Sequence, residues 1–395
     1  MSFNISLTGL NAVSDQLDTV SNNIANVGTV GFKSSRTEFG SVYADSQAMG
    51  VEVLGNTQSI SLGGSLTNTS RSLDLAISGA GFFVVKSASG ETQYTRAGVF
   101  NTDNANNVVN AAGQRLQGYS VDAAGNLQSG VLGDIQVKTA SLPAKATDSL
   151  QFVANLDADG DVPTVAFDPA TSASYNSTYT TKVYDSQGKE HTLTQYFVKN
   201  ADNDWTSNYY VDGAAAGTQA LTFDAAGMLT SPTTPTTLNV AGLAGGVNPL
   251  AISVDYTGTT QYGSDFAVTT NKASGYASGD KTGLTVDEDG MVYVNYSNGE
   301  RLLQGQVVLA NFVNPEGLKA VSGTAWTETS ASGGALIGAA GGGQFGDLVA
   351  GALEGSNVDL TAQLVNLMEG QRNYQANTKV LTTDKELTQA LFSAI

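Results

Sequence analysis

Apolar residues recur every seven positions over the first 24 residues of the chain, and a second row runs beside the first with polar residues between them. This period predicts a helix with a narrow apolar seam of the coiled-coil kind. The seam ends at Ile24, where the pattern stops. The residues of this predicted seam are Phe3, Leu7, Leu10, Val13, Leu17, Val20 and Ile24.

The same spacing returns near the end of the chain, starting at Leu353. Asn357 and Asp359 are both suited to cap a first helical turn, because their side chains accept hydrogen bonds from free backbone amides. We expect a helix from about residue 359 to about residue 393. Its seam residues are Leu360, Leu364, Leu367, Tyr374, Leu381, Leu387 and Leu391.

Two interpretations of these helices remain open. They are either ordinary amphipathic helices on separate domains, or they pair with each other or with neighbouring copies of the chain. Two features favour pairing. Both seams keep a strict seven-residue period. Both helices also lie at the ends of the chain, where segments are usually poorly ordered unless they are held in place. A lone helix of about 25 residues is marginal in water, so its stability must come from a partner.

The first seam breaks off in the stretch NNIANVGTVGFK, residues 22–33. Asn and Gly both tolerate the left-handed conformation that ends a helix, but a simple helix end needs only one such residue. The excess predicts an extended connector after the helix. We expect Phe32 to anchor it by apolar contact, and Lys33 and Arg36 to pair with acidic neighbours.

Between the two helices the pattern is typical of β-structure. Runs rich in Val, Thr, Tyr and Phe, such as residues 178–185 and 191–199, lie between turn residues. Four segments place Asp three residues before Gly, which favours a tight turn in a hairpin. They begin at Asp122, Asp185, Asp224 and Asp287.

If the terminal helices pair, the chain must go out from them and come back to them. It therefore enters each domain between the helices and later leaves that domain near the same place. We therefore expect a mainly β chain with nested, discontinuous β domains and a coiled-coil-like pair of terminal helices. The Gly-rich stretch 330–346 predicts a flexible or extended connection. The expected parts are a helical domain (1–28 and 359–395), an extended connector (29–70 and 325–358), a discontinuous β domain (71–142 and 285–324) and an inserted distal β domain (143–284).

Composition removes most catalytic and metal-dependent functions. The chain has no cysteine and a single histidine, His191, which we expect on the surface. Trp205 and Trp326 are expected in local cores. "DADGD" (157–161) resembles the start of a calcium loop, but the sixth place, where such a loop needs glycine, is Val162. "GAAGGGQFG" (338–346) lacks the Lys-Ser/Thr of a phosphate loop. We expect no enzyme activity, no cofactor and no metal.

The net charge of −18 opposes binding to nucleic acid. The acidic excess is concentrated in the middle, with −8 over residues 143–284 against −2 over residues 1–30 and −2 over residues 354–395. Near-neutral ends suit dense packing, and an acidic middle suits a surface exposed to water. No apolar run of about 18 residues is present, so we expect no membrane insertion. The N-terminus also lacks the pattern of a cleaved signal peptide.

The stretch SNNIANVGTVGFKSSR (21–36) resembles the N-terminal signature ANxxTxGFK of the bacterial flagellar rod and hook protein family. Residues 353–381 look like the companion C-terminal signature. The chain's length and residues 175–199 are similar to the hook members rather than the shorter rod members. The signature and connector residues are Asn22, Asn23, Asn26, Gly28, Gly31, Phe32, Lys33, Asn357, Asp359, Gln371 and Arg372.

This resemblance implies a structural subunit that stacks helically into a curved tube, a flexible universal joint carrying torque from motor to filament. Implied partners are further copies of the chain, a rod protein below, a hook-filament junction protein above, the hook cap and the export apparatus. The implied location is extracellular, reached by type III-like export. Alternatives are another axial protein (distal rod or hook-associated) and a β-rich adhesin or calcium-binding module.

Overall fold

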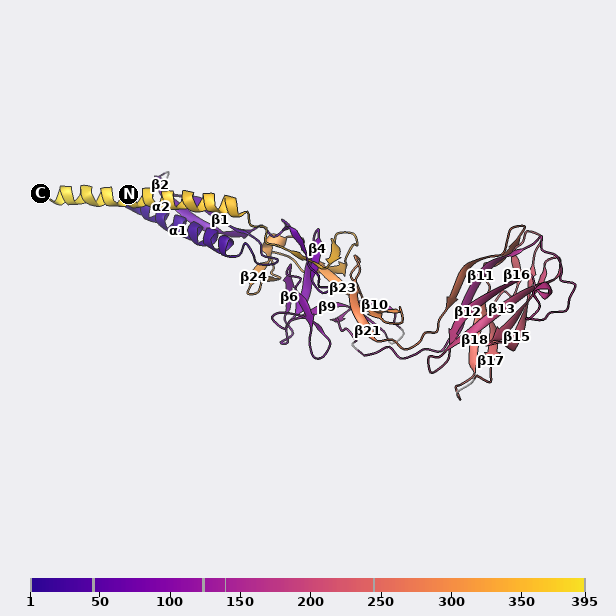
Figure 1. The fold of residues 1–395 in the computed structure, drawn as a ribbon. Coiled ribbons are helices and arrows are strands. Elements are labelled where there is room, and N and C mark those ends of the chain that lie inside the picture. The colour runs from indigo at the N-terminus through magenta and orange to yellow at the C-terminus, as the bar shows by residue number, and fades with distance from the viewer. Residues whose placement is uncertain (1, 45–46, 123–124, 139, 244–245, 394–395) are drawn as a thin grey trace. The chain divides into compact units, whose positions relative to one another are not determined.

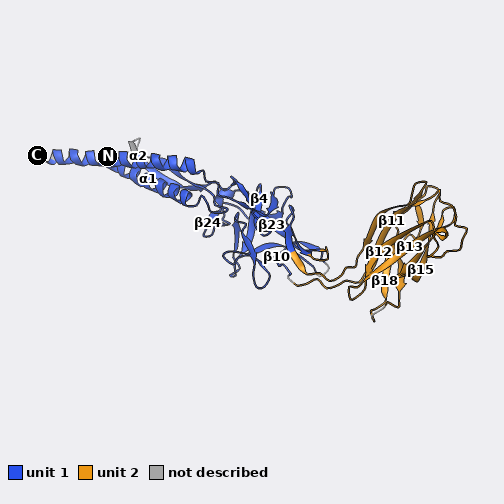
Figure 2. Ribbon diagram, viewed as in Figure 1, with its two compact units in different colours: residues 1–139, 283–295, 301–395 blue, residues 140–282, 296–300 orange. Residues whose placement is uncertain are grey.

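The computed structural model describes residues 2–44, 47–122, 125–138, 140–243 and 246–393. These residues are mainly β, with a helix at each end of the chain (Figure 1), which confirms the expected fold class. Two compact units are present (Figure 2): unit 1 contains residues 1–139, 283–295 and 301–395, and unit 2 contains residues 140–282 and 296–300. The chain thus leaves unit 1, builds unit 2 and returns.

The terminal helices of unit 1 begin and end where local chemistry dictates. Helix α1 (Ser2–Ala25) stops at the Asn-Gly stretch. Helix α2 (Leu360–Ser393) is capped by Asp359, whose Oδ1 accepts the amides of Thr361 at 2.9 Å and Ala362 at 3.1 Å. Of the two candidate caps, Asp359 is therefore the one used. The two helices pack side by side (Figure 1).

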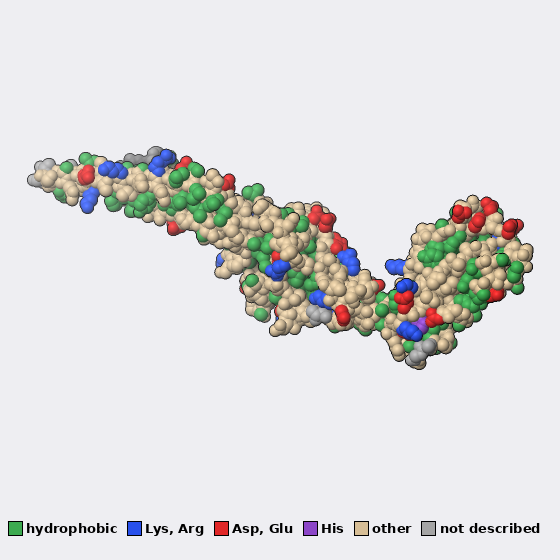
Figure 3. All heavy atoms as spheres, viewed as in Figure 1, with side chains coloured by type: hydrophobic (Ala, Val, Ile, Leu, Met, Phe, Trp, Pro, Cys, Tyr) green, Lys and Arg blue, Asp and Glu red, His purple; other side chains and the backbone are tan. Residues whose placement is uncertain are grey.

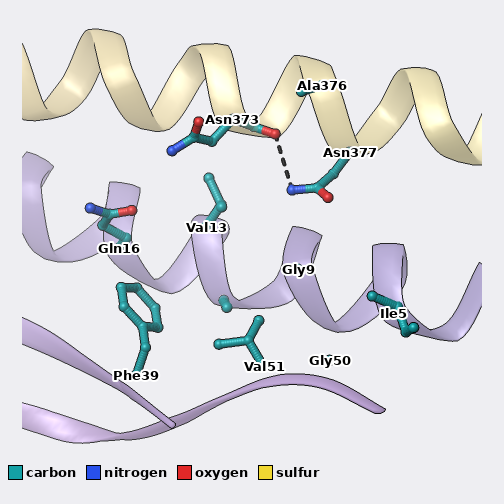
Figure 4. A pocket seen from close by; sticks show the side chains of 11 residues that line it. Ile5, Gly9, Val13, Gln16, Phe39, Gly50, Val51, Asn373, Ala376 and Asn377 are labelled. Atoms are coloured by element: carbon teal, nitrogen blue, oxygen red, sulfur yellow. Dashed lines mark hydrogen bonds between the residues drawn. The ribbon is translucent and has the colours of Figure 1, made fainter. Parts of the chain in front are cut away.

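A two-stranded hairpin covers another side of α1. It consists of β1 (Ser35–Ala44) and β2 (Gln47–Gln58), paired antiparallel. The hydroxyl of Thr37 on β1 donates to the hydroxyl of Thr19 on α1 at 2.9 Å in a buried contact. Helix α1 therefore lies between α2 and the hairpin, and the three elements form one layered helical part of unit 1 (Figure 4).

The β body of unit 1 is built on one large sheet, in which three strands of the N-terminal arm lie between strands of the C-terminal arm. Its main path is β21-β22-β23-β9-β5-β6-β25-β24. The strands are β5 (Phe82–Lys86), β6 (Thr92–Thr95), β7 (Phe100–Thr102), β8 (Val108–Asn110), β9 (Arg115–Val121), β10 (Leu127–Asp134), β21 (Lys281–Val286), β22 (Met291–Tyr296), β23 (Arg301–Asn311), β24 (Lys319–Val321), β25 (Ala325–Thr327) and β26 (Leu336–Ala339).

Two short antiparallel pairs join the arms closer to the helices: β3 (Leu66–Asn68) with β28 (Ala352–Glu354), and β4 (Leu75–Ser78) with β27 (Asp347–Ala350). A core of aromatic residues lies within the body. Phe82 meets Phe312 and Trp326 edge to face, with ring centroids 5.9 and 5.7 Å apart. Trp326 is buried, so its predicted place in a local core is confirmed.

The Gly-rich stretch 330–346 is not a free linker. Its residues Leu336–Ala339 form β26, which pairs antiparallel with β23. Phe345 packs closely over Gly338, at a position where an added Cβ would collide with the ring. Glycine therefore serves close packing here, and sequence composition alone does not distinguish that use from flexibility.

Unit 2 is a sandwich of two sheets around one apolar core. One sheet has the order β17-β18-β11-β19 with β20 on β11, and the other runs β12-β13-β14-β15-β16. Phe152 and Phe197, one from each sheet, stack with centroids 5.6 Å apart, and Trp205 lies in the same core, as predicted. The strands are β11 (Ser149–Asp157), β12 (Ser177–Tyr184), β13 (Glu190–Ala201), β14 (Asp204–Val211), β15 (Ala214–Phe223), β16 (Leu229–Ser231), β17 (Thr236–Val240), β18 (Leu250–Asp255), β19 (Thr260–Tyr262) and β20 (Ala267–Ala273).

The predicted Asp-Gly turns are confirmed at all four places. In each turn the glycine amide donates to the carbonyl oxygen of the aspartate three residues earlier, at 2.9–3.1 Å. Each glycine has a φ of +79° to +86°, which only glycine adopts without strain. The central residues of the first turn, 123 and 124, lie outside the described residues.

The expectation that His191 lies on the surface is wrong. Its ring is buried between two carboxylates: Nδ1 lies 2.6 Å from Asp212 Oδ2, and Nε2 lies 3.2 Å from Asp185 Oδ2. Burial by itself lowers a histidine pKa, but the hydrogen bonds to Asp212 and Asp185 outweigh burial and raise the pKa of His191. The acidic partners come from two turns, so the sequence near His191 did not reveal both of them.

Candidate assembly interface

The asparagines of the broken-helix stretch tie backbone segments together. Asn23 is buried at the end of α1, where its Oδ1 accepts the amide of Ser35 at 2.9 Å and its Nδ2 donates to the Ser35 carbonyl at 2.7 Å. Nδ2 also approaches Gln363 Oε1 on α2 at 3.3 Å. One side chain thus links α1, the start of the hairpin and α2.

Asn357 performs the matching task from the C-terminal arm. Its Oδ1 accepts the amide of Ser34 at 2.7 Å, and its Nδ2 donates to the carbonyls of Ser59 and Leu62, both at 3.0 Å. All of these partners belong to the N-terminal connector. The two connectors are therefore held side by side by an amide side chain that satisfies otherwise unpaired backbone groups.

The other signature residues occupy different environments. Gly31 has φ +70° and lies so close to Ala97 that an added Cβ would be 2.5 Å from its amide nitrogen. Gly28 has open space around it, and Asn26 Nδ2 donates to the Asn22 carbonyl at 2.9 Å. Phe32 is half-buried. Exposed signature residues are Asn22, Gly28, Asp359, Gln371 and Arg372.

Both basic residues of the connector have acidic partners. Lys33 Nζ lies 2.6 Å from Glu354 Oε1, fully inside the protein. Arg36 pairs with Glu38 at 2.6 Å on the surface. Lys33 is thus a buried component of the joint between helical part and β body, whereas Arg36 makes a solvent-exposed pair of the kind that contributes little stability.

Helices α1 and α2 contact each other through small residues at two points. The side chain of Leu17 lies over Gly370, and Asn377 lies over Gly9, leaving no room for a Cβ at Gly370. This close approach selects a stripe of α2 that differs from the predicted row of sevens. Leu367 and Leu381 are half-buried, but Leu360 and Tyr374 of the same row are exposed.

The predicted seam is therefore only partly covered within one copy of the chain. Val20 is buried, and the side chain of Leu391 lies outside the described residues. The half-buried seam residues are Leu10, Val13, Leu17, Ile24, Leu367 and Leu381. The exposed ones are Phe3, Leu7, Leu360, Leu364, Tyr374 and Leu387.

Further apolar side chains, outside the predicted seam residues, are exposed on the same part. On α2, Met368 is 61% exposed and Phe392 is 74% exposed. On the hairpin, Phe39, Tyr43 and Leu54 are exposed. Figure 3 shows apolar side chains spread along the visible face of the helical part. A concentration of exposed apolar side chains on one part of a protein is typical of an interaction site.

A hollow of about 450 Å³ opens between α1, α2 and the hairpin (Figure 4). Apolar side chains of Ile5, Val13 and Val51 line it, and the amides of Asn373 and Asn377 lie along its α2 side. Asn377 Nδ2 donates to the Asn373 carbonyl at 3.1 Å. The lining contains no nucleophile and base pair, so the hollow is suited to receiving an apolar side chain rather than to chemistry.

Within the part of the chain that the structure describes, no group of three or more His, Asp or Glu side chains is arranged to hold a metal ion. The same residues contain no helix that is both long and apolar enough to cross a membrane.

Four protein-family models match the chain in order and cover most of it. "Flagella basal body rod protein" matches residues 3–33, and "Flagellar hook protein FlgE/F/G D1 domain" matches residues 76–162. "Flagellar basal body protein FlaE D2 domain" matches residues 155–276, and "Flagellar basal body rod FlgEFG protein C-terminal" matches residues 349–394. The first and last matches contain the two signatures.

Relatives described as flagellar hook protein FlgE match over almost their whole length. The Salmonella typhimurium protein is 39% identical over 404 residues, covering 99% of each chain. The Escherichia coli K12 protein is 38% identical over 402 residues, also covering 99% of each. The Borreliella burgdorferi protein is 32% identical over 430 residues, covering 98% of this chain and 97% of its own.

Among solved structures, the crystal structure of Helicobacter pylori flagellar hook protein FlgE2 matches with a TM-score of 0.54. The match covers 71% of this chain and 98% of that one at 14% identity, so it supports the fold alone. The full-length sequence matches favour neither a rod protein nor an adhesin. The chain therefore belongs to the flagellar hook protein FlgE family and is a structural subunit of the bacterial flagellar hook.

Proposed function

We propose that copies of this chain assemble through their helical parts into a curved helical tube that bends while it transmits torque from the rod to the filament. The observation that carries this proposal is the apolar surface left uncovered on α2 and the hairpin. Burying one such Leu, Val or Met side chain against another copy contributes about 1.5–3 kcal/mol. Several contacts of this size per subunit suffice to hold a polymer together.

The register of the two helices supports contacts of head-to-tail type. Gly9 lies beside Asn377, and Asn23 lies beside Gln363. This antiparallel register places Ser2 level with Asp384, so the last turns of α2 extend beyond Ser2. Leu387 and Phe392 on this extension are 64% and 74% exposed. Identical contacts between one end of a subunit and another part of the next produce an open helix rather than a closed ring.

The uncovered apolar side chains of α1 and α2 also support a coupling between folding of the terminal helices and assembly of the polymer. With only part of the seam covered, each terminal helix lacks much of the packing that stabilises helices of this length in water. We propose that the ends become fully ordered only on assembly, which delays polymerisation until the chain has been exported. Circular dichroism of the monomer should then show less helix than the polymer; equal helix content would contradict this step.

Charge supports a division into layers. The terminal helices (1–28 and 359–395) would form the inner tube, and the connectors (29–70 and 325–358), which include the hairpin, would join them to the β domain (71–142 and 285–324). The distal domain (143–284) would face water. Acidic side chains are prominent on the visible face of unit 2 (Figure 3). Polar, hydrated contacts between distal domains would slide as the tube bends.

The proposed partners are other copies, a rod protein below, a junction protein above, and the hook cap and export apparatus during assembly. The proposed place is outside the cell, reached by type III-like export without a cleaved signal. The role is purely mechanical, with no catalysis and no cofactor.

Electron microscopy of the concentrated, purified protein tests the proposal. Curved tubes are expected for the intact chain, and none after removal of residues 1–30 or residues 355–395. Amorphous aggregates or closed rings from the intact chain would contradict the proposal that it assembles into a tube. Val313→Ser, which changes an almost fully exposed valine of the β body, serves as the control and should still form tubes.

A further inference from the structure

Three charged side chains meet inside unit 1 where the helical part joins the β body. Glu354 Oε1 lies 2.6 Å from Lys33 Nζ, and Glu354 Oε2 lies 3.2 Å from Arg96 Nη1. The side chains of Lys33, Arg96 and Glu354 are 0%, 5% and 1% exposed. We call these three residues the charge cluster. Its members come from the N-terminal connector, the β body and the C-terminal connector.

Glu354 is the common acceptor of the charge cluster. Besides the two cations, its Oε1 accepts the amide of Gly64 at 2.9 Å, and its carbonyl oxygen accepts the amide of Gly31 at 2.8 Å. One residue of β28 therefore binds two separate parts of the N-terminal connector, residues 31–33 and Gly64, and also Arg96 of the body. The carboxylate also provides the negative charge between two buried cations.

The cations are held by neutral groups on their other sides. Lys33 Nζ donates to the Leu62 carbonyl at 2.6 Å, and Arg96 Nη2 donates to the Gly79 carbonyl at 2.8 Å. The guanidinium of Arg96 lies 5.2 Å from the centre of the Phe82 ring. Burial lowers the pKa of Lys33, and the hydrogen bond and charge of Glu354 oppose that effect. Removal of one partner from a buried pair leaves an uncompensated charge and is strongly destabilising.

We propose that Glu354 is a positioning residue that makes closure of the joint conditional on both ends of the chain. Without the C-terminal connector, Lys33 and Arg96 would be two buried cations with no anion, so the N-terminal connector stays detached from the body. Because Glu354 lies on the C-terminal connector and Lys33 on the N-terminal connector, the joint closes only when both connectors are in place. This inference concerns one copy and holds whether or not a tube forms.

The test compares Glu354→Gln with Glu38→Gln in the full chain by hydrogen exchange. Glu38→Gln is a matched control, since it removes a carboxylate from the exposed Arg36 pair of the same arm. In Glu354→Gln, exchange in peptides covering residues 26–34 and 60–66 should accelerate at least tenfold. In Glu38→Gln it should stay within twofold, and peptides of unit 2 should be unchanged in both.

A second comparison separates charge from space filling. Lys33→Met leaves a neutral Arg96–Glu354 pair, so exchange should accelerate less than in Glu354→Gln. The double variant Lys33→Met/Glu354→Gln leaves one buried cation rather than two, so it should recover part of the protection lost in Glu354→Gln. If Glu354→Gln fails to fold, the remaining comparison is between Lys33→Met, which keeps the Arg96–Glu354 pair, and the double variant, which leaves Arg96 unpaired; Lys33→Met should be the better protected of the two. A double variant as unprotected as the single, or wild-type exchange in Glu354→Gln, would overturn the proposal.

Discussion

The side chain of Asn23, at the end of α1, makes two hydrogen bonds to the backbone of Ser35. Its Oδ1 accepts a hydrogen bond from the Ser35 N–H, and its Nδ2 donates one to the Ser35 carbonyl oxygen, as in a pair of neighbouring strand residues. This relationship turns the chain from α1 into β1 at a fixed angle. Asn23 is buried, and removal of its side chain leaves the amide and the carbonyl of Ser35 without these partners.

Asn23→Ala should therefore destabilise unit 1 by about 1–3 kcal/mol, because two backbone groups of Ser35 lose their partners. The neighbouring Asn22 is exposed, so Asn22→Ala should stay within about 0.5 kcal/mol of the wild type. Denaturant unfolding followed by a probe in unit 1 measures both. Equal losses in the two variants would argue against the pairing as the cause.

Gly31→Ala should destabilise the joint much more than Gly28→Ala. Gly31 combines φ +70° with a close approach to the backbone of residues 96 and 97, whereas Gly28 has open space around it. The left-handed conformation alone costs alanine about 1–2 kcal/mol, and the clash adds to it. Thermal unfolding of the two variants checks the difference, and a neutral Gly31→Ala would show that the connector adapts freely.

Unit 2 should lose stability as pH rises through the pKa of His191. The folded pKa lies above the unfolded value of about 6.5, so the protonated, doubly bonded ring stabilises the fold fully below about pH 6.5. That contribution disappears above the raised pKa. Unfolding of unit 2 measured from pH 5 to pH 9 should show this loss, and His191→Gln should remove the pH dependence. A wild type and variant with parallel pH profiles would contradict the assignment.

The exposed apolar side chains of α2 should matter to assembly and hardly to the fold. Leu364→Ser with Met368→Ser should abolish sedimentable polymer while the melting temperature of the monomer changes by less than about 2 °C, because neither side chain is buried within one copy. Val313→Ser, which changes an almost fully exposed valine of the β body, is the control and should polymerise normally. Polymer formation by the α2 variant would show that Leu364 and Met368 do not lie in the interface between copies.

Local patterns predicted the elements well. The seven-residue row from Phe3 to Ile24 predicted α1 and its end, Asp359 predicted the start of α2, and the Asp-Gly spacing predicted the hairpin turns. These features depend on residues close together in sequence, whose preferences a single sequence reveals.

Contacts between distant residues were not predictable in the same way. Glu354 lies 321 positions from Lys33, and nothing in its local sequence distinguishes it from a solvated acid. The local sequence also did not reveal that Asp212 hydrogen-bonds to the buried His191. Nor did it reveal the contact of Leu17 with Gly370, which brings a face of α2 other than the row of sevens against α1.

A reconstruction of the assembled polymer by electron cryomicroscopy tests the central claim most directly. We expect α1 and α2 to form the innermost layer, with Leu364, Met368 and Leu387 buried against neighbouring copies and unit 2 on the outside. A tube whose inner wall is built by unit 2, or in which these α2 side chains remain exposed to water, would contradict assembly through the helical part.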